Sequence, residues 1–549
     1  MATQEIRQRL ETLFPRLADV PASADFAPAA GTYPDGTLYL IDGEVRRWTG
    51  PTNEVRSPVY VATADGRVER RLLGAHAALT KEEALAALAA ASRAWDHGRG
   101  RWPTMSVGQR IEAVLAFVAG MQQVREESVR LLMWEIGKTR ADSEKEFDRT
   151  VQYVLDTVEA LKDMDRSAGR FSASAGILAQ VRRAPLGVVL CMGPFNYPLN
   201  ETFTTLVPAL IMGNTVVAKL PRYGMLCQAP LLRAFAAAFP PGVVNVVNGD
   251  GRTVAGPLVE TGDIAALAFI GSSRVANVLK KQHPKPNRLR SILGLDAKNP
   301  AIVLPDADLE LAVRECLAGA LSFNGQRCTA LKLLYVHRSL AERFLQQLAD
   351  AVDALPFGMP WEQGVKLTPL PEEGKAETLQ TLVQDAVAKG ARVVNAHGGL
   401  VNRSFYFPAV VYPVDRRMAL HSVEQFGPLV PVAPFDDVRE VVDEIVASDF
   451  GQQASVFGRD ARSVGPLVDV LANQVCRVNL NAQCQRGPDV YPFTGRKDSA
   501  ESTLSVSDAL RCFSIRSMVA APGEDANRAL LRDVLSGRTS NFLNTDYLF

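Results

Sequence analysis

The feature that most constrains this chain is a series of short, almost entirely apolar runs that alternate with helical stretches between residues 187 and 336. Apolar strands separated by helices are typical of parallel sheets that are covered on both faces. The sequence therefore predicts an α/β fold, in which ligands bind beyond the carboxyl ends of the strands. The predicted strands occupy residues 187–193, 214–221, 243–249, 267–271, 301–305 and 331–336, and the predicted helices occupy residues 224–238, 251–261, 273–281 and 308–322.

The segments outside this alternation predict additional parts. Residues 21–60 are rich in Pro, Gly and Asp and predict an irregular N-terminal arm with a hairpin. A helix is expected after Thr80, a capping candidate that is followed by two glutamates. The polar segment 167–185 predicts a protruding hairpin, and residues 512–520 predict a late strand. A chain of 549 residues is too long for a single core, so two or three domains are expected.

Charge and cysteine content argue against several classes of partner. The 60 basic and 60 acidic residues cancel, so nothing indicates binding to nucleic acid or to an anionic membrane. The seven cysteines form no CxxC pair and do not cluster with the six histidines, which argues against a metal site and for a reducing compartment. We find no secretory signal and no apolar run long enough to span a bilayer, and therefore expect a cytoplasmic protein.

Cys328 is the strongest candidate nucleophile. It lies in the segment SFNGQRCTALK directly after Arg327, and a neighbouring cation lowers the pKa of a thiol and favours the reactive thiolate. A single cysteine in a long chain is more often a buried structural residue, so the surrounding motif has to decide. Asn196, in the segment PFNYP at the end of a predicted strand, offers an amide donor to an oxyanion, although the same residues also suit an ordinary turn.

Several separated segments resemble, in this order, the aldehyde dehydrogenase family: PFNYP, NTVVAKLPR, FIGS, SFNGQRC and EQFGP. The resemblance covers residues 75–520 and is greatest to the NADP-dependent, non-phosphorylating glyceraldehyde-3-phosphate dehydrogenases. It implies that Cys328 attacks the aldehyde carbon to give a thiohemiacetal, and that hydride transfer to a nicotinamide cofactor leaves a thioacyl-enzyme. It also implies that Asn196 and the backbone N–H of Cys328 hold the oxyanion.

The same resemblance implies a Rossmann-type cofactor domain, an α/β catalytic domain and a small hairpin through which subunits form a homodimer or homotetramer. The expected division of the chain is an N-terminal arm at 1–74, a cofactor-binding domain at 75–166 and 186–294, a catalytic domain at 295–508, an oligomerisation segment at 167–185 and 509–520, and a C-terminal tail at 521–549.

The cofactor contacts are also implied by the resemblance. Lys219 matches the family's strand-Lys-Pro segment, which implies that it contacts the adenosine ribose. NAD-preferring members usually have an acidic residue three positions later, whereas this chain has Arg222, whose guanidinium favours a 2′-phosphate. We therefore expect NADP, with NAD as the alternative. Contacts with the pyrophosphate or the nicotinamide ribose are further implied for Gly271, Ser272, Glu424 and Phe426.

A cluster of cations is expected to bind a phosphorylated aldehyde. In the branch that this sequence resembles, arginines and a tyrosine bind the substrate phosphate, and arginine forks suit phosphate oxygens. Each arginine taken alone is more often a surface residue. The implied reaction is oxidation of glyceraldehyde 3-phosphate to 3-phosphoglycerate, a step of carbohydrate metabolism. The matching positions are Arg149, Tyr197, Arg327 and Arg486.

The sequence departs from the family at the general base. The family normally has Glu-Leu-Gly-Gly-Lys upstream of the cysteine, whereas this chain has Gly294-Leu295-Asp296-Ala297-Lys298. Glycine cannot accept a proton from the water that hydrolyses the thioester. Three interpretations stay open: Asp296 acts as a displaced base, the acyl group passes to coenzyme A or phosphate, or the protein binds cofactor and aldehyde without efficient turnover.

Overall fold

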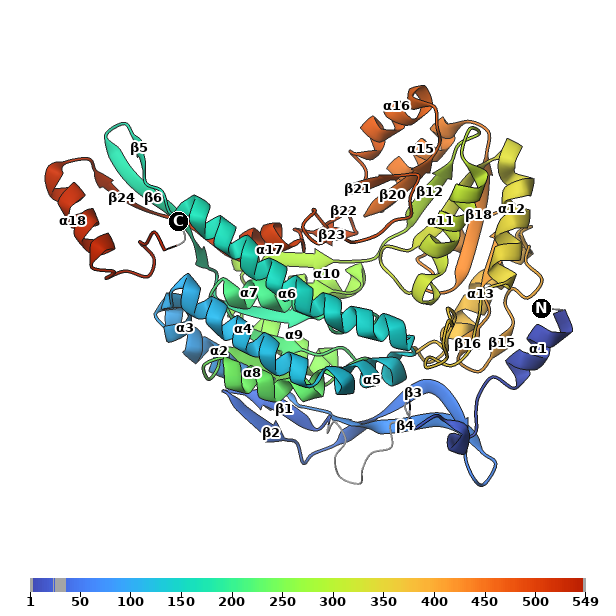
Figure 1. Ribbon diagram of the computed structural model, residues 1–549, viewed down its shortest axis with the longest axis horizontal. Coiled ribbons are helices and arrows are strands. Elements are labelled where there is room, and N and C mark those ends of the chain that lie inside the picture. The colour runs from blue at the N-terminus through green and yellow to red at the C-terminus, as the bar shows by residue number, and fades with distance from the viewer. Residues whose placement is uncertain (1–2, 23, 25–35, 547–549) are drawn as a thin grey trace.

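The computed structural model describes residues 3–22, 24 and 36–546. Residues 23 and 25–35 of the predicted arm, and residues 547–549 of the predicted tail, lie outside the described residues. Figure 1 shows two halves, each built around a sheet flanked by helices, and a three-stranded sheet that projects from one of them. The α/β class expected from the alternating sequence is confirmed.

The first half contains an eight-stranded sheet of order β2-β1-β9-β8-β7-β10-β11-β23. The five inner strands from β9 to β11 run parallel, and β1 and β23 add antiparallel edges. The strands are β1 Leu38–Ile41, β2 Glu44–Arg47, β7 Val188–Met192, β8 Thr215–Lys219, β9 Val244–Val247, β10 Ile264–Ile270, β11 Arg290–Gly294 and β23 Ala500–Glu501.

Helices cover both faces of this sheet, which explains why its inner strands are apolar throughout. Leu190 of β7 packs in one core cluster with residues of α2, whereas its neighbours Val189 and Cys191 pack in a second cluster with residues of α7. Thr80 caps α2 as predicted, through a capping box with Glu83. The helices of this half are α2 Lys81–Trp95, α3 Arg101–Thr104, α4 Val107–Gln123, α5 Arg125–Ile136, α6 Arg140–Ala168, α7 Asn200–Ile211, α8 Leu232–Ala238, α9 Gly251–Glu260, α10 Ser273–Gln282 and α17 Val506–Cys512.

The second half contains a seven-stranded sheet of order β14-β17-β18-β13-β12-β20-β21, parallel except for the β14–β17 pair. Its strands are β12 Asn299–Val303, β13 Leu331–His337, β14 Arg392–Val393, β17 Ala409–Tyr412, β18 Leu429–Phe435, β20 Gln453–Phe457 and β21 Arg477–Leu480. Its helices are α11 Leu309–Leu321, α12 Arg338–Asp353, α13 Lys375–Ala388, α14 Ala419–Ser422, α15 Val438–Ala447 and α16 Ala461–Leu471.

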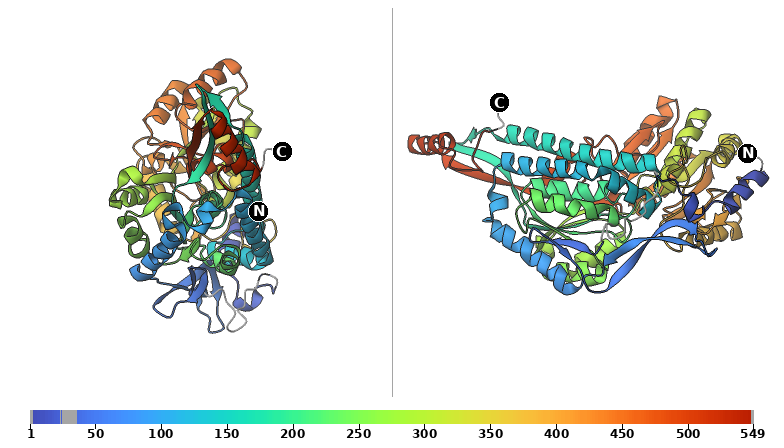
Figure 2. Two further views of the ribbon diagram at one scale, coloured as in Figure 1. Left: turned by 90° about the vertical axis from the view of Figure 1, so that its left-hand side faces the viewer. Right: turned by 60° about the horizontal axis from the view of Figure 1, so that its bottom comes forward.

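A three-stranded antiparallel sheet projects from the eight-stranded half. It consists of β5 Ser172–Ser174, β6 Ile177–Pro185 and β24 Ser514–Pro522, in the order β24-β6-β5. The predicted late strand thus pairs along the predicted hairpin, although α6 runs on to Ala168 before the hairpin begins. Figure 2 shows this sheet standing away from the body, with α18 Asp525–Ser536 at its far end.

The N-terminal segment is more regular than its composition suggests. After α1 Thr3–Glu11, strands β1 and β2 extend the eight-stranded sheet, with Leu40 opposite Val246. Strands β3 Thr52–Ala62 and β4 Val68–Ala77 form a long ribbon that lies along the lower side of the molecule in Figure 1. The shorter two-residue pairs are β15 Val401–Asn402 with β16 Phe405–Tyr406, and β19 Phe450–Gly451 with β22 Arg496–Lys497.

Candidate active site

Cys328 is presented by a tight backbone turn between α11 and β13. The turn Ser322–Gly325 holds Phe323, Asn324 and Gly325 at φ of 50°, 53° and 71°. Only glycine fits the last of these positions, because a Cβ there would lie 2.6 Å from the carbonyl oxygen of Gly427. The carbonyl of Cys328 then accepts hydrogen bonds from Asn299 Nδ2 at 2.8 Å and from Lys332 Nζ at 3.1 Å. The backbone of the nucleophile is therefore fixed from both sides.

Two cavities meet at Cys328. The first, of about 360 Å³ and here called the inner cavity, gathers the predicted catalytic residues and most of the predicted cofactor residues. The second, of about 420 Å³ and here called the arginine cavity, gathers the predicted substrate residues. Cys328 and Glu201 line both cavities. The predicted residues in the inner cavity are Asn196, Gly271, Ser272, Asp296, Glu424 and Phe426, and those in the arginine cavity are Arg149, Tyr197, Arg327 and Arg486.

A buried ion pair positions the loop that contains Asn196. Lys138 and Glu146 have no exposed side-chain surface and bind each other, and Lys138 Nζ also donates to the carbonyl of Asn196 at 2.8 Å. Glu146 Oε1 accepts the N–H groups of Leu199 and Asn200 at 3.0 and 3.2 Å. The loop and the first turn of α7 are therefore held by one carboxylate.

The environment of the Cys328 thiol corrects one expectation. Burial and the charge of Glu201 raise the pKa of Cys328, and the cations Lys332 and Arg486 only partly oppose them. The expected lowering by Arg327 is wrong, because that guanidinium binds the carbonyls of Ala318 and Gly319. The thiol is held in its protonated form and needs a proton acceptor before it can attack.

Gly294 and Asp296 line the same cavity as Cys328, but only Asp296 has a side chain that can accept a proton. Gly294 ends β11 in the inner cavity, where an added Cβ would lie 3.3 Å from Leu504 Cδ1. Asp296 Oδ2 accepts a hydrogen bond of 2.7 Å from the N–H of Ser273, the first residue of α10. The carboxylate of Asp296 thus binds the helix N-terminus at which the sequence predicts pyrophosphate.

The rest of the inner cavity is formed by rigid contacts. Glu424 forms a buried ion pair with Lys332, and Phe426 packs edge-to-face on Phe195 at a centroid distance of 5.8 Å. A Cβ at Gly271 would lie 2.3 Å from the end of the Phe269 ring, so a larger residue there would displace that ring. Ser272 caps α10 by accepting the N–H of Val275 at 3.4 Å.

Lys219 and Arg222, which are predicted to bind the adenosine ribose and its 2′-phosphate, line a third cavity of about 710 Å³, here called the adenosine cavity. Lys219 ends β8 there, and burial lowers its pKa to about 8, against the opposing charge of Asp250. Arg222 lies over the ring of Tyr223 at 5.3 Å. The sequence interpretation missed Arg56 and Arg70 of the β3–β4 ribbon, which line the same cavity, because their segment was expected to be irregular.

The charges of the arginine cavity are distributed unevenly. Arg149 binds Asp489 through two hydrogen bonds of 3.1 and 2.9 Å, and Arg486 binds both Asp489 and Glu201. Arg327 contacts carbonyl oxygens and Gln483, and its Nε has no hydrogen-bond partner in the described part of the chain. Glu201 and Asp489 were missed from the sequence, although Asp489 follows Arg486 at helical spacing in RGPD.

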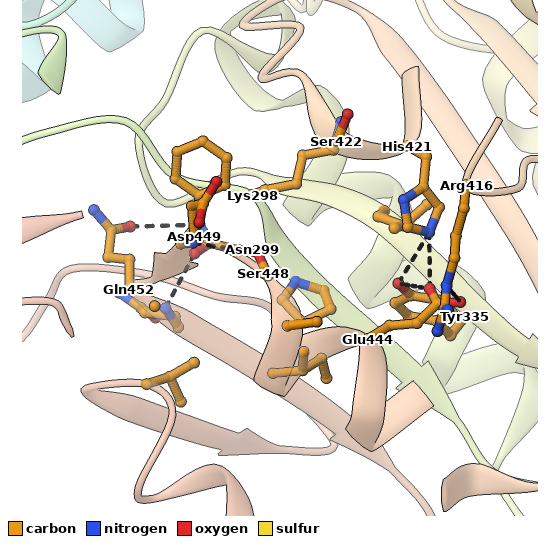
Figure 3. A pocket seen from close by; sticks show the side chains of 18 residues that line it. Lys298, Asn299, Tyr335, Arg416, His421, Ser422, Glu444, Ser448, Asp449 and Gln452 are labelled. Carbon is orange, nitrogen blue, oxygen red and sulfur yellow. Dashed lines mark hydrogen bonds and ion pairs between the residues drawn. The ribbon is translucent and has the colours of Figure 1, made fainter. Parts of the chain in front are cut away.

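A separate cavity of about 330 Å³, which Lys298 helps to line, contains none of the predicted site residues (Figure 3). Burial disfavours the charge of Glu444, but hydrogen bonds from His421 and Tyr335, supported by Arg416, lower its pKa to about 2. Glu444 is therefore already bound by three side chains of the same cavity. Lys298 itself donates to the carbonyls at residues 420 and 423 and so fixes the segment that contains Glu424.

Two further findings limit the classes of site. The described residues contain no group of three or more His, Cys, Asp or Glu side chains that could hold a metal ion. Among the same residues, no helix combines the length and the apolar character that crossing a membrane requires.

Comparison with known proteins agrees with this geometry. The chain is 33% identical over 444 residues to an NADP-dependent glyceraldehyde-3-phosphate dehydrogenase of Streptococcus equinus, covering 79% of this chain and 90% of that protein. It is 30% identical over 363 residues to a 3-sulfolactaldehyde dehydrogenase of Priestia aryabhattai, covering 65% and 75% of the two chains. The crystal structure of an NADP-dependent glyceraldehyde-3-phosphate dehydrogenase from Bacillus halodurans C-125, complexed with NADP, matches with a TM-score of 0.80 at 29% identity and covers 89% of this chain and 99% of that one.

Residues 65–519 match the aldehyde dehydrogenase family. The fold, the nucleophile turn and the order of the motifs agree with this match, and the chain belongs to the aldehyde dehydrogenase family.

Proposed function

We propose that this chain oxidises glyceraldehyde 3-phosphate to 3-phosphoglycerate through a thioester on Cys328, with NADP as the hydride acceptor. The observation that carries the proposal is the position of Arg327. It precedes the nucleophile, lines the same cavity and has no carboxylate partner among the described residues. A guanidinium that is not already neutralised suits a phosphate group.

The adenosine cavity supports the choice of NADP. Its lining supplies four cations, Lys219, Arg222, Arg56 and Arg70, of which Arg56 is paired with Glu54. This donor set fits the 2′-phosphate and pyrophosphate groups of the cofactor. When bound, the nicotinamide accepts the hydride. Glu424 and Phe426 line the inner cavity, in which the nicotinamide ribose would lie.

The remaining chemistry belongs to the residues around Cys328. The Cys328 thiol releases its proton to water, and the thiolate attacks the aldehyde carbon. The side-chain amide of Asn196 and the N–H of Cys328 donate to the oxygen on which negative charge develops. Arg327 and Tyr197 hold the phosphate of the substrate in the arginine cavity. Collapse of the thiohemiacetal expels the hydride and leaves a thioester, which water must hydrolyse to complete the cycle.

The test is NADP reduction by purified protein with glyceraldehyde 3-phosphate, without added phosphate or coenzyme A. Sustained turnover supports the proposal. Unphosphorylated glyceraldehyde is the matched control, and an equal kcat/KM for both aldehydes would contradict the phosphate assignment. Because one relative is named for sulfolactaldehyde, that sulfonate is a third substrate to compare. A higher kcat/KM for the sulfonate would assign the cavity to a different anion.

Gly294 favours a second candidate function, in which coenzyme A or phosphate takes the acyl group. This acylating reaction needs no base to activate water. It predicts one NADPH per site followed by arrest, and turnover after addition of coenzyme A or phosphate. A burst that neither acceptor extends would instead indicate a cofactor-binding protein with impaired deacylation, the third interpretation.

We also propose that the projecting sheet mediates assembly into a homodimer or homotetramer. Strand β24 exposes Ile515 and Met518, and α18 exposes Leu530 beside it. Exposed apolar side chains on a projecting element are typical of an interface. Light scattering gives the mass of the particle, and removal of residues 515–549, which leaves α17 intact, is expected to yield monomers.

A further inference from the structure

Hydrolysis of the thioester needs a group that removes a proton from water, and the family's position for this group is glycine here. Gly294 lines the inner cavity without a side chain. If the acyl group leaves to water, as in the proposed function, another residue has to act as the base. The inference below rests on that proposed function.

Glu201 occupies the required place. It belongs to the first turn of α7, five residues after Asn196, and its exposed fraction is 6%. Glu201 lines both cavities, as Cys328 does. The Glu146 carboxylate fixes the backbone just before it. The position of Glu201 is therefore set by the same contacts that set Asn196.

The side-chain hydrogen bond of Glu201 uses one of its two carboxylate oxygens. Arg486 binds only Oε2, and the same guanidinium is shared with Asp489 and the carbonyl of Leu504. The other oxygen, Oε1, has no hydrogen-bond partner within residues 3–22, 24 and 36–546. Oε1 therefore remains available to accept a hydrogen bond from a water molecule.

The other carboxylates of the inner cavity have partners, as Glu201 does, but they differ from it in position. Asp296 binds the N–H of Ser273, Glu424 is paired with Lys332, and Glu372 is paired with Lys375. None of the three lines the arginine cavity. The charge of Glu201 also acts more strongly on the Cys328 thiol than that of Glu424, which agrees with a shorter separation. We propose that Glu201 is the general base that activates water for hydrolysis of the Cys328 thioester.

The step balances without any further reactant. Glu201 removes one proton from water as the water oxygen bonds to the thioester carbon, and the resulting oxyanion is held by Asn196. The C–S bond then breaks, the sulfur of Cys328 leaves with the electron pair, and the proton on Glu201 passes to it. The product carboxylic acid releases its own proton to solvent, and no group is oxidised or reduced.

The decisive experiment is rapid-quench kinetics of Glu201→Gln with glyceraldehyde 3-phosphate and NADP. We expect a burst of one NADPH per site, as in the unmodified protein, and a steady-state rate lower by about 10²–10⁴-fold. Intact-mass spectrometry should detect the accumulated acyl-enzyme. Hydroxylamine, which attacks a thioester without a general base, should restore turnover. An unchanged steady-state rate, or loss of the burst, would overturn the proposal.

Two variants separate this role from a structural one. Glu342→Gln removes a carboxylate from the exposed face of α12, outside both cavities, and should keep both burst and steady state. Gly294→Glu, added to Glu201→Gln, should recover hydrolysis at least tenfold, because a side chain fits there if Leu504 moves by a few tenths of an ångström. If Asp296→Asn blocks hydrolysis and Glu201→Gln does not, Asp296 is the base.

A cofactor-free assay distinguishes failure of this inference from failure of the proposed function. p-Nitrophenyl acetate acylates an active-site thiol without NADP. Glu201→Gln should release one nitrophenolate per site and then stop, whereas the unmodified protein should continue. If no aldehyde is oxidised but this difference is found, the substrate assignment fails and the role of Glu201 stands. If both proteins continue equally, the role of Glu201 fails.

Discussion

The side-chain amide of Asn196 donates a hydrogen bond of 2.8 Å to the backbone carbonyl of Gln326, two residues before the nucleophile. The contact joins the PFNYP loop of the eight-stranded half to the nucleophile turn of the other half. One amide hydrogen is used in this way, and the second remains for an oxyanion. Asn196 therefore helps to hold the turn in position, and its second amide hydrogen is the one that we propose donates to the oxyanion.

Replacing Asn196 by Ala should lower kcat/KM by about 10²–10³-fold, which is the usual effect of losing one oxyanion donor. The rate of the NADPH burst should fall by a similar factor, because the donor acts in formation of the thioester. Stopped-flow absorbance measures both. A variant that loses activity but binds NADP with unchanged affinity meets the prediction, whereas a burst at the original rate contradicts it.

Replacing Arg327 by Ala should lower kcat/KM for glyceraldehyde 3-phosphate by about 10–100-fold, since a hydrogen bond to a charged group contributes ~1.5–3 kcal/mol. The loss with unphosphorylated glyceraldehyde should be small. Arg149→Ala is the matched control, and its effect should be smaller because Asp489 already neutralises that guanidinium. Equal losses for both variants, or equal losses for both aldehydes, would speak against Arg327 as the phosphate ligand.

Replacing Glu201 by Gln should make Cys328 more reactive while turnover slows. Burial and Glu201 raise the pKa of the thiol, so the thiolate fraction at neutral pH increases when the carboxylate is removed. The alkylation rate with iodoacetamide, measured against pH, should shift to lower pH in this variant. Glu342→Gln, outside both cavities, should leave the profile in place. A profile that does not move in Glu201→Gln would mean that the two groups are not in electrostatic contact.

Affinity for NADP should weaken as pH rises through about 8, the pKa to which burial lowers Lys219. Above that pH the amine is neutral and no longer attracts the cofactor phosphates. We expect an increase in Kd of about five- to tenfold, equivalent to ~1–1.4 kcal/mol. Fluorescence titration on either side of this pH measures it. Lys219→Met should abolish the pH dependence of NADP binding. Arg222→Gln should weaken NADP binding but leave its pH dependence unchanged.

The sequence predicts the strands well because their apolar runs have one physical cause. Residues of β7 and β8 are buried on both faces, and such strands differ sharply in composition from the helices between them. The hairpin expected within residues 21–60 is found as strands β1 and β2, but the attachment of β1 to the eight-stranded sheet is not predicted. That attachment depends on the antiparallel contact of Leu40 with Val246, which no local pattern encodes.

At the site, the sequence predicts which residues gather but not which charges cancel. Arg486 and Glu201 are 285 positions apart, and their ion pair exists only in the folded chain. Because contacts between distant residues cannot be read from the sequence, the rise in the pKa of Cys328 is not predicted either. Arg327 is adjacent in sequence, yet its side chain turns toward the end of α11, while a carboxylate from α7 faces the thiol.

The nucleophile and the inferred base belong to different halves of the molecule. Cys328 precedes β13 of the seven-stranded sheet, and Glu201 lies in α7 against the eight-stranded sheet. The acyl group is therefore bound to one half while its release depends on the other. A slight rotation between the halves would lengthen the lifetime of the thioester without altering any bond already made. Substitutions between the two halves, far from the thiol, can thus set how long the acyl-enzyme persists. They can also decide whether water or a stronger nucleophile reaches the thioester first.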